Sequence, residues 1–140
     1  MAIDLYWDDD EQTTMLCVFE RGWTWDDLFE MLHTARRATD ERDYEVGAII
    51  DLTHGSEIPG GSIFSASTRE NARRVLRMGE DGRGPLVLVR AGSTIKTLLK
   101  AVAMLDKSAL EDVYFAASLD EGRAILQRRL ATDRRRTTVS

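Results

Sequence analysis

Apolar residues recur at every second position in the first part of the chain. Ile3, Leu5 and Trp7 follow this period, the acidic segment Asp8–Gln12 interrupts it, and a second alternating run ends at Phe19. A two-residue period is typical of strands with one buried face, and a short polar segment between two such runs is typical of a turn. The pattern therefore predicts a β-hairpin at the start of the chain.

The period then changes to that of an amphipathic helix. Thr24 is a suitable N-cap with Asp27 at the third helical position, and Trp23 is placed to pack on Leu28 across the first turn. The apolar stripe of this helix consists of Trp25, Leu28, Leu32 and Ala35. Acidic residues lie in the first turn and basic residues in the last, as the helix dipole favours.

Strand and helix patterns alternate through the rest of the chain. Nearly continuous apolar runs predict strands that are covered on both faces, and the segments between them have helical spacing. The predicted strands are Val46–Leu52, Leu86–Val89 and Val113–Ala116, and the predicted helices run from Phe64 to near Gly79, from Ile95 to Leu105 and from the capping box Ser118–Glu121 to Leu130. The predicted order of elements is ββαβαβαβα.

This order indicates a single α/β domain. A chain of 140 residues is of ordinary size for one domain. The alternation predicts a five-stranded, mostly parallel sheet that includes the hairpin and has helices on both faces. We place the domain at residues 1–131 and expect the basic segment 132–140, which has no apolar period, to be a flexible tail. The order of the strands in the sheet is left open.

Composition and charge exclude several classes of protein. With 43% hydrophobic and 31% charged residues, the chain is not of low complexity or disordered. Its net charge of −5 argues against nucleic-acid binding, and its basic segments lack the interleaved aromatic residues that bind single strands. Residues 1–30 hold nine acidic residues against the single Arg21, so contact with a basic segment of another copy is expected instead.

The sequence predicts no cofactor, no metal and no membrane span. Cys17 is the single cysteine, and with His33 and His54 it forms no set at zinc-site spacing, so we expect neither a disulfide nor a structural metal. No apolar run approaches the roughly 18 residues that span a bilayer, and the acidic N-terminal segment is unlike a signal peptide. A cytoplasmic location is the resulting expectation.

Four short segments are similar to those of a known family. They are Trp23–Leu28 at the start of the first helix, Ile49–Leu52 at the end of the central strand, Pro59–Gly61 before the second helix and Ser118–Gly122 at the start of the last helix. On these segments, and on the order of elements from residue 3 to 131, the chain resembles the STAS-domain superfamily, and more closely its SpoIIAA-like (STAS/CRAL-TRIO-like) branch. The resemblance implies an α/β sandwich with a non-enzymatic regulatory or protein-interaction role.

The same resemblance implies a place for phosphorylation. In STAS-type antagonists a Ser or Thr in the turn after the central strand is phosphorylated by a partner kinase. The matching turn here is Ile58–Ser62, in which Gly60 stands where that residue belongs. A shift of register offers Ser56 or Ser62 as the acceptor, and a phosphate at a helix N-terminus is electrostatically favourable.

Polar side chains are most concentrated just after the central strand, where open α/β sheets bind ligands. This candidate ligand-binding or partner-binding loop consists of Asp51, Thr53, His54, Ser56, Glu57, Gly60, Gly61 and Ser62. An enzyme would use His54 as base, Asp51 to orient it and Ser56 or Ser62 as nucleophile, but the spacing matches no catalytic motif, so we assign no catalytic residue. Gly60–Ser62, like Gly92–Thr94 before a later helix, could instead hold an anion.

Bulky apolar residues gather around the first helix. The set is Trp23, Trp25, Leu28, Phe29 and Leu32. These side chains form ordinary core, or they line an apolar pocket between the helix and the sheet that accepts an acyl chain. They also exceed the single stripe that a packed helix needs, and the surplus ring of Phe29 is expected to mark an interface if it is not part of such a pocket.

Two classes of function follow. The first is a non-enzymatic STAS-like, SpoIIAA-like domain that binds a protein partner or binds itself as a homodimer. The alternative is a domain that binds a small molecule, either a lipid-like ligand between the first helix and the sheet or an anion at Gly60–Ser62.

Overall fold

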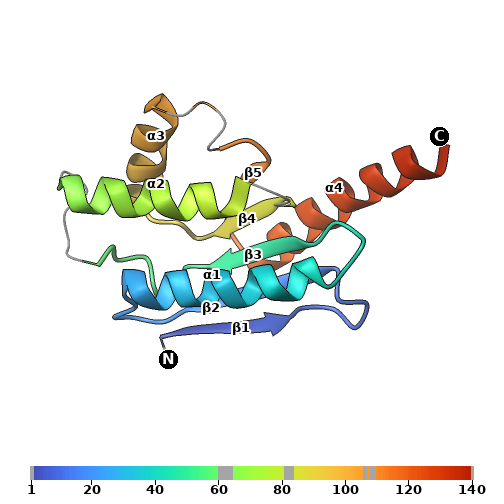
Figure 1. Ribbon diagram of the computed structural model, residues 1–140, viewed down its shortest axis with the longest axis horizontal. Coiled ribbons are helices and arrows are strands. Elements are labelled where there is room, and N and C mark those ends of the chain that lie inside the picture. The colour runs from blue at the N-terminus through green and yellow to red at the C-terminus, as the bar shows by residue number, and fades with distance from the viewer. Residues whose placement is uncertain (1, 60–64, 81–83, 106, 108–109, 140) are drawn as a thin grey trace.

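The computed structural model describes residues 2–59, 65–80, 84–105, 107 and 110–139, and these form an α/β sandwich of five strands and four helices (Figure 1). The elements are β1 (Ile3–Trp7), β2 (Thr14–Phe19), α1 (Trp25–Asp40), β3 (Gly47–Asp51), α2 (Ala66–Glu80), β4 (Leu86–Val89), α3 (Ser93–Leu105), β5 (Val113–Ala116) and α4 (Leu119–Val139). The predicted order of elements and the predicted hairpin are confirmed.

The sheet places its strands in the order of the chain, from β1 to β5 (Figure 1). β1 and β2 are antiparallel, with Leu5 opposite Cys17, and the remaining neighbours are parallel, with Cys17 beside Ile50 and Ile50 beside Leu88. Each parallel step moves one strand further in the same direction. Right-handed crossovers of this kind put all the connecting helices on one face of the sheet.

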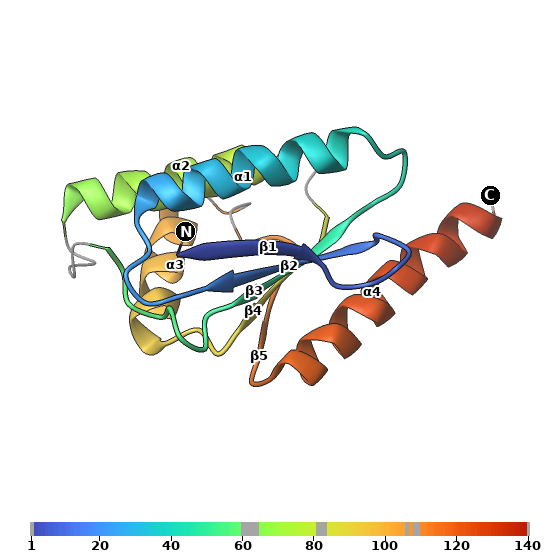
Figure 2. The same ribbon diagram turned by 90° about the horizontal axis from the view of Figure 1, so that it is seen from below.

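Figure 2 shows the resulting layers, with α1, α2 and α3 on one side of the sheet and α4 on the other. Helices therefore cover both faces, as predicted. Side chains alternate across each strand, so the core is divided in two. Ile50, Leu52 and Leu88 face the layer of three helices, whereas Ile49, Val87 and Leu126 belong to a second cluster under α4.

The two layers approach the sheet differently. On the α4 side, Gly122 lets the helix come close, since a Cβ there would lie 3.1 Å from Val89 Cγ2 and 3.3 Å from Val87 Cγ1. Leu126 fills the space beside it and is 1% exposed. On the other side, the nearest backbone neighbours of α2 are α1 and α3 rather than the strands. α2 and α3 therefore stand further from the sheet than α4 does, whereas α1 comes close to it at β1.

The ends of the helices test the predicted boundaries. The capping box of α1 is confirmed, since Thr24 Oγ1 accepts from the Asp27 N–H and Asp27 Oδ2 accepts from the Thr24 N–H, both at 3.1 Å. α4 continues to Val139, although its apolar period ends near Ala131. Segment 132–139 contains no Gly or Pro that would stop the helix, and it contains three Arg, a residue that favours helices. The apolar period of a helix indicates which residues are buried and does not indicate where the helix ends.

Candidate functional site

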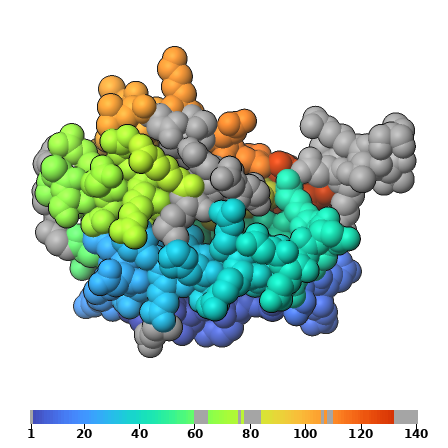
Figure 3. All heavy atoms as spheres, in the orientation of Figure 1, coloured from blue at the N-terminus to red at the C-terminus, as the bar shows by residue number. Residues whose placement is uncertain are grey.

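A cavity of about 240 Å³ lies between the sheet and the layer formed by α1, α2 and α3. Figure 3 shows α1 and α2 side by side over the face of the molecule that covers it. The wall on α1 is one stripe, which contains Trp25, Leu28, Leu32, Ala35, Arg36 and Thr39. Since α1 rises about 1.5 Å per residue, this stripe extends over ~21 Å, so the cavity is elongated along the helix.

The rest of the lining is apolar. The sheet contributes Cys17, Phe19, Ile50, Leu52 and Leu88, and α2 and α3 contribute Ala72, Val75, Ile95, Leu98 and Leu99. Among the described residues, Arg36 and Thr39 are the only charged or hydroxyl side chains of the lining. A cavity with so few polar partners does not hold ordered water and is suited to apolar molecules.

Four of the five apolar residues singled out in the sequence lie on this cavity, namely Trp23, Trp25, Leu28 and Leu32. Trp23 packs edge-on against Phe19 and Trp25, with ring centroids 5.1 and 5.5 Å apart. Phe29 lies elsewhere, with the Arg74 guanidinium from α2 stacked 4.4 Å from its ring centroid. Phe29 is thus the aromatic residue of α1 that lies outside the cavity-lining stripe, and its contact with Arg74 accounts for its presence there.

Cys17 faces the cavity from the middle of β2. Its Sγ lies 3.7 Å from Met31 Sδ, and the side chain is 2% exposed. Burial raises the pKa of the Cys17 thiol from 9.0 to about 12, because an apolar environment disfavours the thiolate. Cys17 is therefore an unreactive core thiol at neutral pH.

This shifted pKa predicts a pH dependence of stability. The unfolded thiol loses its proton near pH 9, whereas the folded thiol keeps it until about pH 12. The contribution of Cys17 is thus complete below pH 9 and falls by about 1.4 kcal/mol per pH unit between pH 9 and 12. Urea unfolding of the wild type and of Cys17→Ala at pH 8, 9 and 10 should show the difference between them shrinking above pH 9. A constant difference would contradict this environment for the thiol.

The segment that follows β3 borders one end of the cavity through Ile58. Trp23 Nε1 donates a hydrogen bond of 2.7 Å to the Gly55 carbonyl. Gly55 itself presses on the end of β2, since a Cβ there would lie 2.6 Å from Phe19 Cβ and 2.8 Å from the Phe19 carbonyl. The segment 53–58 is thereby held against the aromatic end of the cavity.

A second, polar pocket of about 370 Å³ lies on the outer side of this segment. It is lined by Glu20, Arg21 and Gly22 from the connection between β2 and α1, and by residues 53–57. The sequence singled out Thr53, His54, Ser56 and Glu57 of this lining but missed residues 20–22. Those residues are found only once β2 and β3 are known to be parallel neighbours, because their carboxyl ends then meet.

The structure separates Asp51 from His54. Asp51 is at an odd position of β3 together with Ile49, and side chains alternate, so its carboxylate lies on the α4 face of the sheet. Asp51 Oδ1 accepts from the Thr53 N–H at 3.0 Å and from the Thr53 hydroxyl at 2.6 Å, a local turn that occupies the carboxylate. His54 is exposed, and no hydrogen bond joins it to another residue in the described ranges.

Of the remaining residues of the candidate loop, the structure describes Ser56 and Glu57. Ser56 is half-buried beside the start of α3, where a Cβ on Gly92 would lie 3.8 Å from Ser56 Oγ. Glu57 is exposed on the polar pocket. Gly60, Gly61 and Ser62, and with them the proposed anion site and one of the two phosphorylation candidates, lie outside the described residues.

Across the described ranges, no three His, Cys, Asp or Glu side chains come together in a way that could hold a metal ion. In the same ranges, no helix combines the length and the apolar character needed to cross a membrane. The longest helix, α4, is rich in arginine.

Comparison with known proteins adds nothing to this geometry. No model of a known protein family matches the sequence, and no curated protein matches it either.

Proposed function

We propose that this chain is a non-enzymatic, STAS-like and SpoIIAA-like binding domain whose ligand is a small apolar molecule in the cavity between α1–α3 and the sheet. The family assignment is supported by the order of elements and by the segments that resemble the SpoIIAA-like branch. The ligand is supported by one observation, the elongated apolar cavity of about 240 Å³.

The size of the cavity favours an occupant. A cavity of about 150 Å³ already accepts benzene, and drug-sized ligands occupy about 300 Å³ or more, so the ligand class is a small molecule such as a medium-length acyl chain.

Filling the cavity from α1 tests this function. Ala35→Leu places three more carbon atoms in the cavity, so we expect it to raise the free energy of unfolding by about 1 kcal/mol and to weaken binding of 1-decanol at least about ten-fold. Thr34→Leu, on the exposed side of the same turn, is the matched control and should leave binding unchanged. Native mass spectrometry of freshly purified protein should also show a ligand adduct. If 1-decanol does not bind the wild type, the proposed function is wrong.

A protein partner or homodimer is the second candidate. The observation that favours it is the sheet's two open edges, since β1 and β5 each have one strand neighbour and each presents an exposed aromatic residue, Tyr6 and Phe115. The acidic segment at the start of the chain supports it less strongly, because Asp8 already makes a bidentate ion pair with Arg123 on α4 at 2.9 Å. Light scattering at two salt concentrations tests this candidate, and a strict monomer would contradict self-association.

A further inference from the structure

Charge is divided unevenly along the chain. Residues 1–60 include 15 acidic and four basic residues, a net charge of −11, whereas residues 66–107 include nine basic and four acidic residues, a net charge of +5. The second range contains α2 and α3, which are in contact with each other. The overall charge of −5 therefore conceals a basic part of the molecule that is formed by two neighbouring helices.

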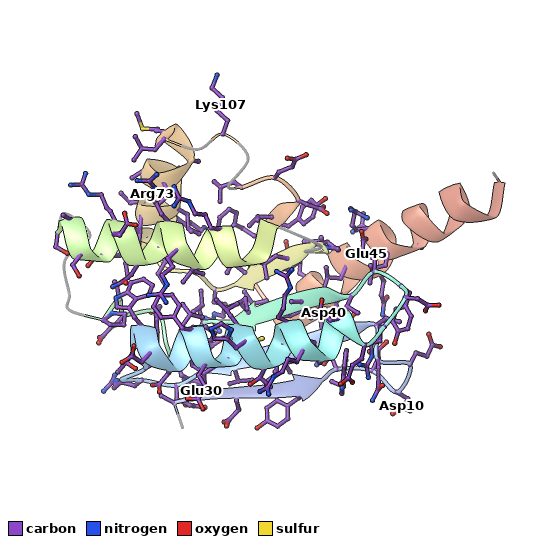
Figure 4. The ribbon with its side chains drawn as sticks, in the orientation of Figure 1. Asp10, Glu30, Asp40, Glu45, Arg73 and Lys107 are labelled. Carbon is purple, nitrogen blue, oxygen red and sulfur yellow. The ribbon has the colours of Figure 1, made fainter. Side chains whose placement is uncertain are left out.

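α3 presents this positive charge on its outer face. The buried residues of the helix are Ile95, Leu98 and Val102. Lys96, Lys100 and Met104, which are spaced by four residues, lie on the opposite side and are exposed. α3 contains no acidic residue. Lys107, just after the helix, points away from the body of the molecule (Figure 4).

The charges of these lysines are available to a partner. No ion pair joins Lys96, Lys100 or Lys107 to an acidic side chain among the described residues. Lys96 Nζ lies 5.5 Å from the ring centroid of Phe115, which is partly exposed on the edge strand β5. An anion that approaches α3 therefore meets ammonium groups that no carboxylate of the described chain neutralises.

Two bulky apolar side chains are exposed at the end of the same helix. Met104 is 84% exposed and Leu105 is 67% exposed, the highest values among the large hydrophobic residues that the structure describes. Figure 3 shows the orange atoms of this part of the chain projecting from the upper edge of the molecule. A projecting apolar tip beside lysines has the composition of a membrane-surface anchor, in which apolar side chains enter the acyl boundary and ammonium groups bind anionic headgroups.

A protein partner fits this tip less well. The centres of protein interfaces are depleted in lysine, and a narrow projection offers little area to a flat partner. A second copy would have to bring its acidic residues 1–60 against α2 and α3. Such a contact joins two different surfaces, so it continues into rings or open chains. A bilayer, in contrast, needs no complementary shape.

We propose that the side of the molecule formed by α2 and α3 docks reversibly on an anionic lipid bilayer, with Met104 and Leu105 at the acyl boundary and the lysines of α3 against the lipid phosphates. A single myristoyl chain binds membranes only marginally, with an association constant of about 10⁴ M⁻¹, and these two side chains are shorter. Charge and apolar contact are therefore both needed. Since α3 is also a wall of the cavity, docking brings the proposed binding site beside a bilayer, where apolar molecules are concentrated.

Sedimentation of the full chain with vesicles tests the docking. One set of vesicles is phosphatidylcholine alone, and the other contains about 30 mol% phosphatidylglycerol. At low salt, about 50 mM, we expect the anionic vesicles to bind the protein at least about ten-fold more tightly than the neutral ones. At about 500 mM salt this preference should disappear, because the attraction to the surface is screened.

Variants separate the charge from the apolar contact. Lys100→Gln should weaken binding to the anionic vesicles about five-fold, whereas Lys100→Arg should retain it. Met104→Gln should weaken it about ten-fold. The matched controls are Arg37→Gln, an exposed cation on α1, and Tyr6→Gln, an exposed aromatic residue on β1, and both should bind like the wild type.

Binding to neither set of vesicles, or equal binding to both at low salt, would overturn the docking, and so would wild-type binding by Lys100→Gln and Met104→Gln. Self-association without vesicles that Met104→Gln abolishes in light scattering would show a protein interface at the tip instead, and would also contradict docking on lipid. The titration with 1-decanol contains no vesicles, so failure of the docking and failure of the proposed function are seen separately.

Discussion

Replacing Gly55 with alanine is expected to lower the free energy of unfolding by about 3 kcal/mol, a large fraction of the stability of such a domain. The added Cβ would lie 2.6 Å from Phe19 Cβ and 2.8 Å from the Phe19 carbonyl carbon and oxygen, so backbone has to move. Moving it also displaces the Gly55 carbonyl, which accepts the hydrogen bond from the buried Trp23 indole. An indole N–H left without its partner adds a desolvation penalty.

Urea unfolding measures this loss, and the emission of Trp23 reports the change around the indole. The matched control is Gly22→Ala. Gly22 has φ +86 and no atom within 4 Å of an added Cβ, so it isolates backbone strain from collision and should cost about 1 kcal/mol. A loss in Gly55→Ala no greater than that in Gly22→Ala would mean that the segment after β3 does not press on β2 as described.

The second large effect is expected on the opposite face of the sheet. Leu126→Ala should lower the free energy of unfolding by about 3–4 kcal/mol, because this side chain is 1% exposed and packs in a cluster with Ile49, Val87 and Val89. The close approach of α4 through Gly122 leaves little room for the surrounding chain to relax into the space.

Leu32→Ala is the control for this prediction. Leu32 is half-buried on α1 and borders the existing cavity, so its side chain has fewer packed neighbours to lose, and we expect a loss of about 1–2 kcal/mol. Urea unfolding of both variants under the same conditions gives the comparison. Equal losses would show that the two faces of the sheet are packed equally tightly and would argue against the cavity.

Local patterns in the sequence predicted the elements well, because the chemistry that starts and ends them is local. Thr24 and Asp27 predicted the start of α1, and the alternation of Ile3 to Phe19 predicted the hairpin. The end of α4 was not predicted, since the residues beyond Ala131 include no Gly or Pro to stop the helix and no apolar face to mark it.

The candidate site was predicted less completely, for reasons of geometry. Side chains that are adjacent in the sequence of a strand point to opposite faces of the sheet. Asp51 therefore faces α4, whereas Leu52 faces the cavity. Phe29 was grouped with the pocket on its hydrophobicity, but the partner that covers it, Arg74, comes from α2. The predicted stripe of α1 ended at Ala35, whereas Arg36 and Thr39 also line the cavity, because nothing local shows that the stripe continues.

The sequence by itself determined the α/β class, the order of elements, the apolar stripe of α1 and the absence of any catalytic or zinc-site spacing, because each depends on residue type and period. Only the tertiary structure decided the strand order, which places three helices on one face and one on the other. It also decided that α2 and α3 stand further from the sheet than α4 does, and with that the cavity and its aromatic end. These depend on crossover handedness and on contacts between distant segments, such as Trp23 with Gly55 and Gly122 with Val89. No local pattern carries that information.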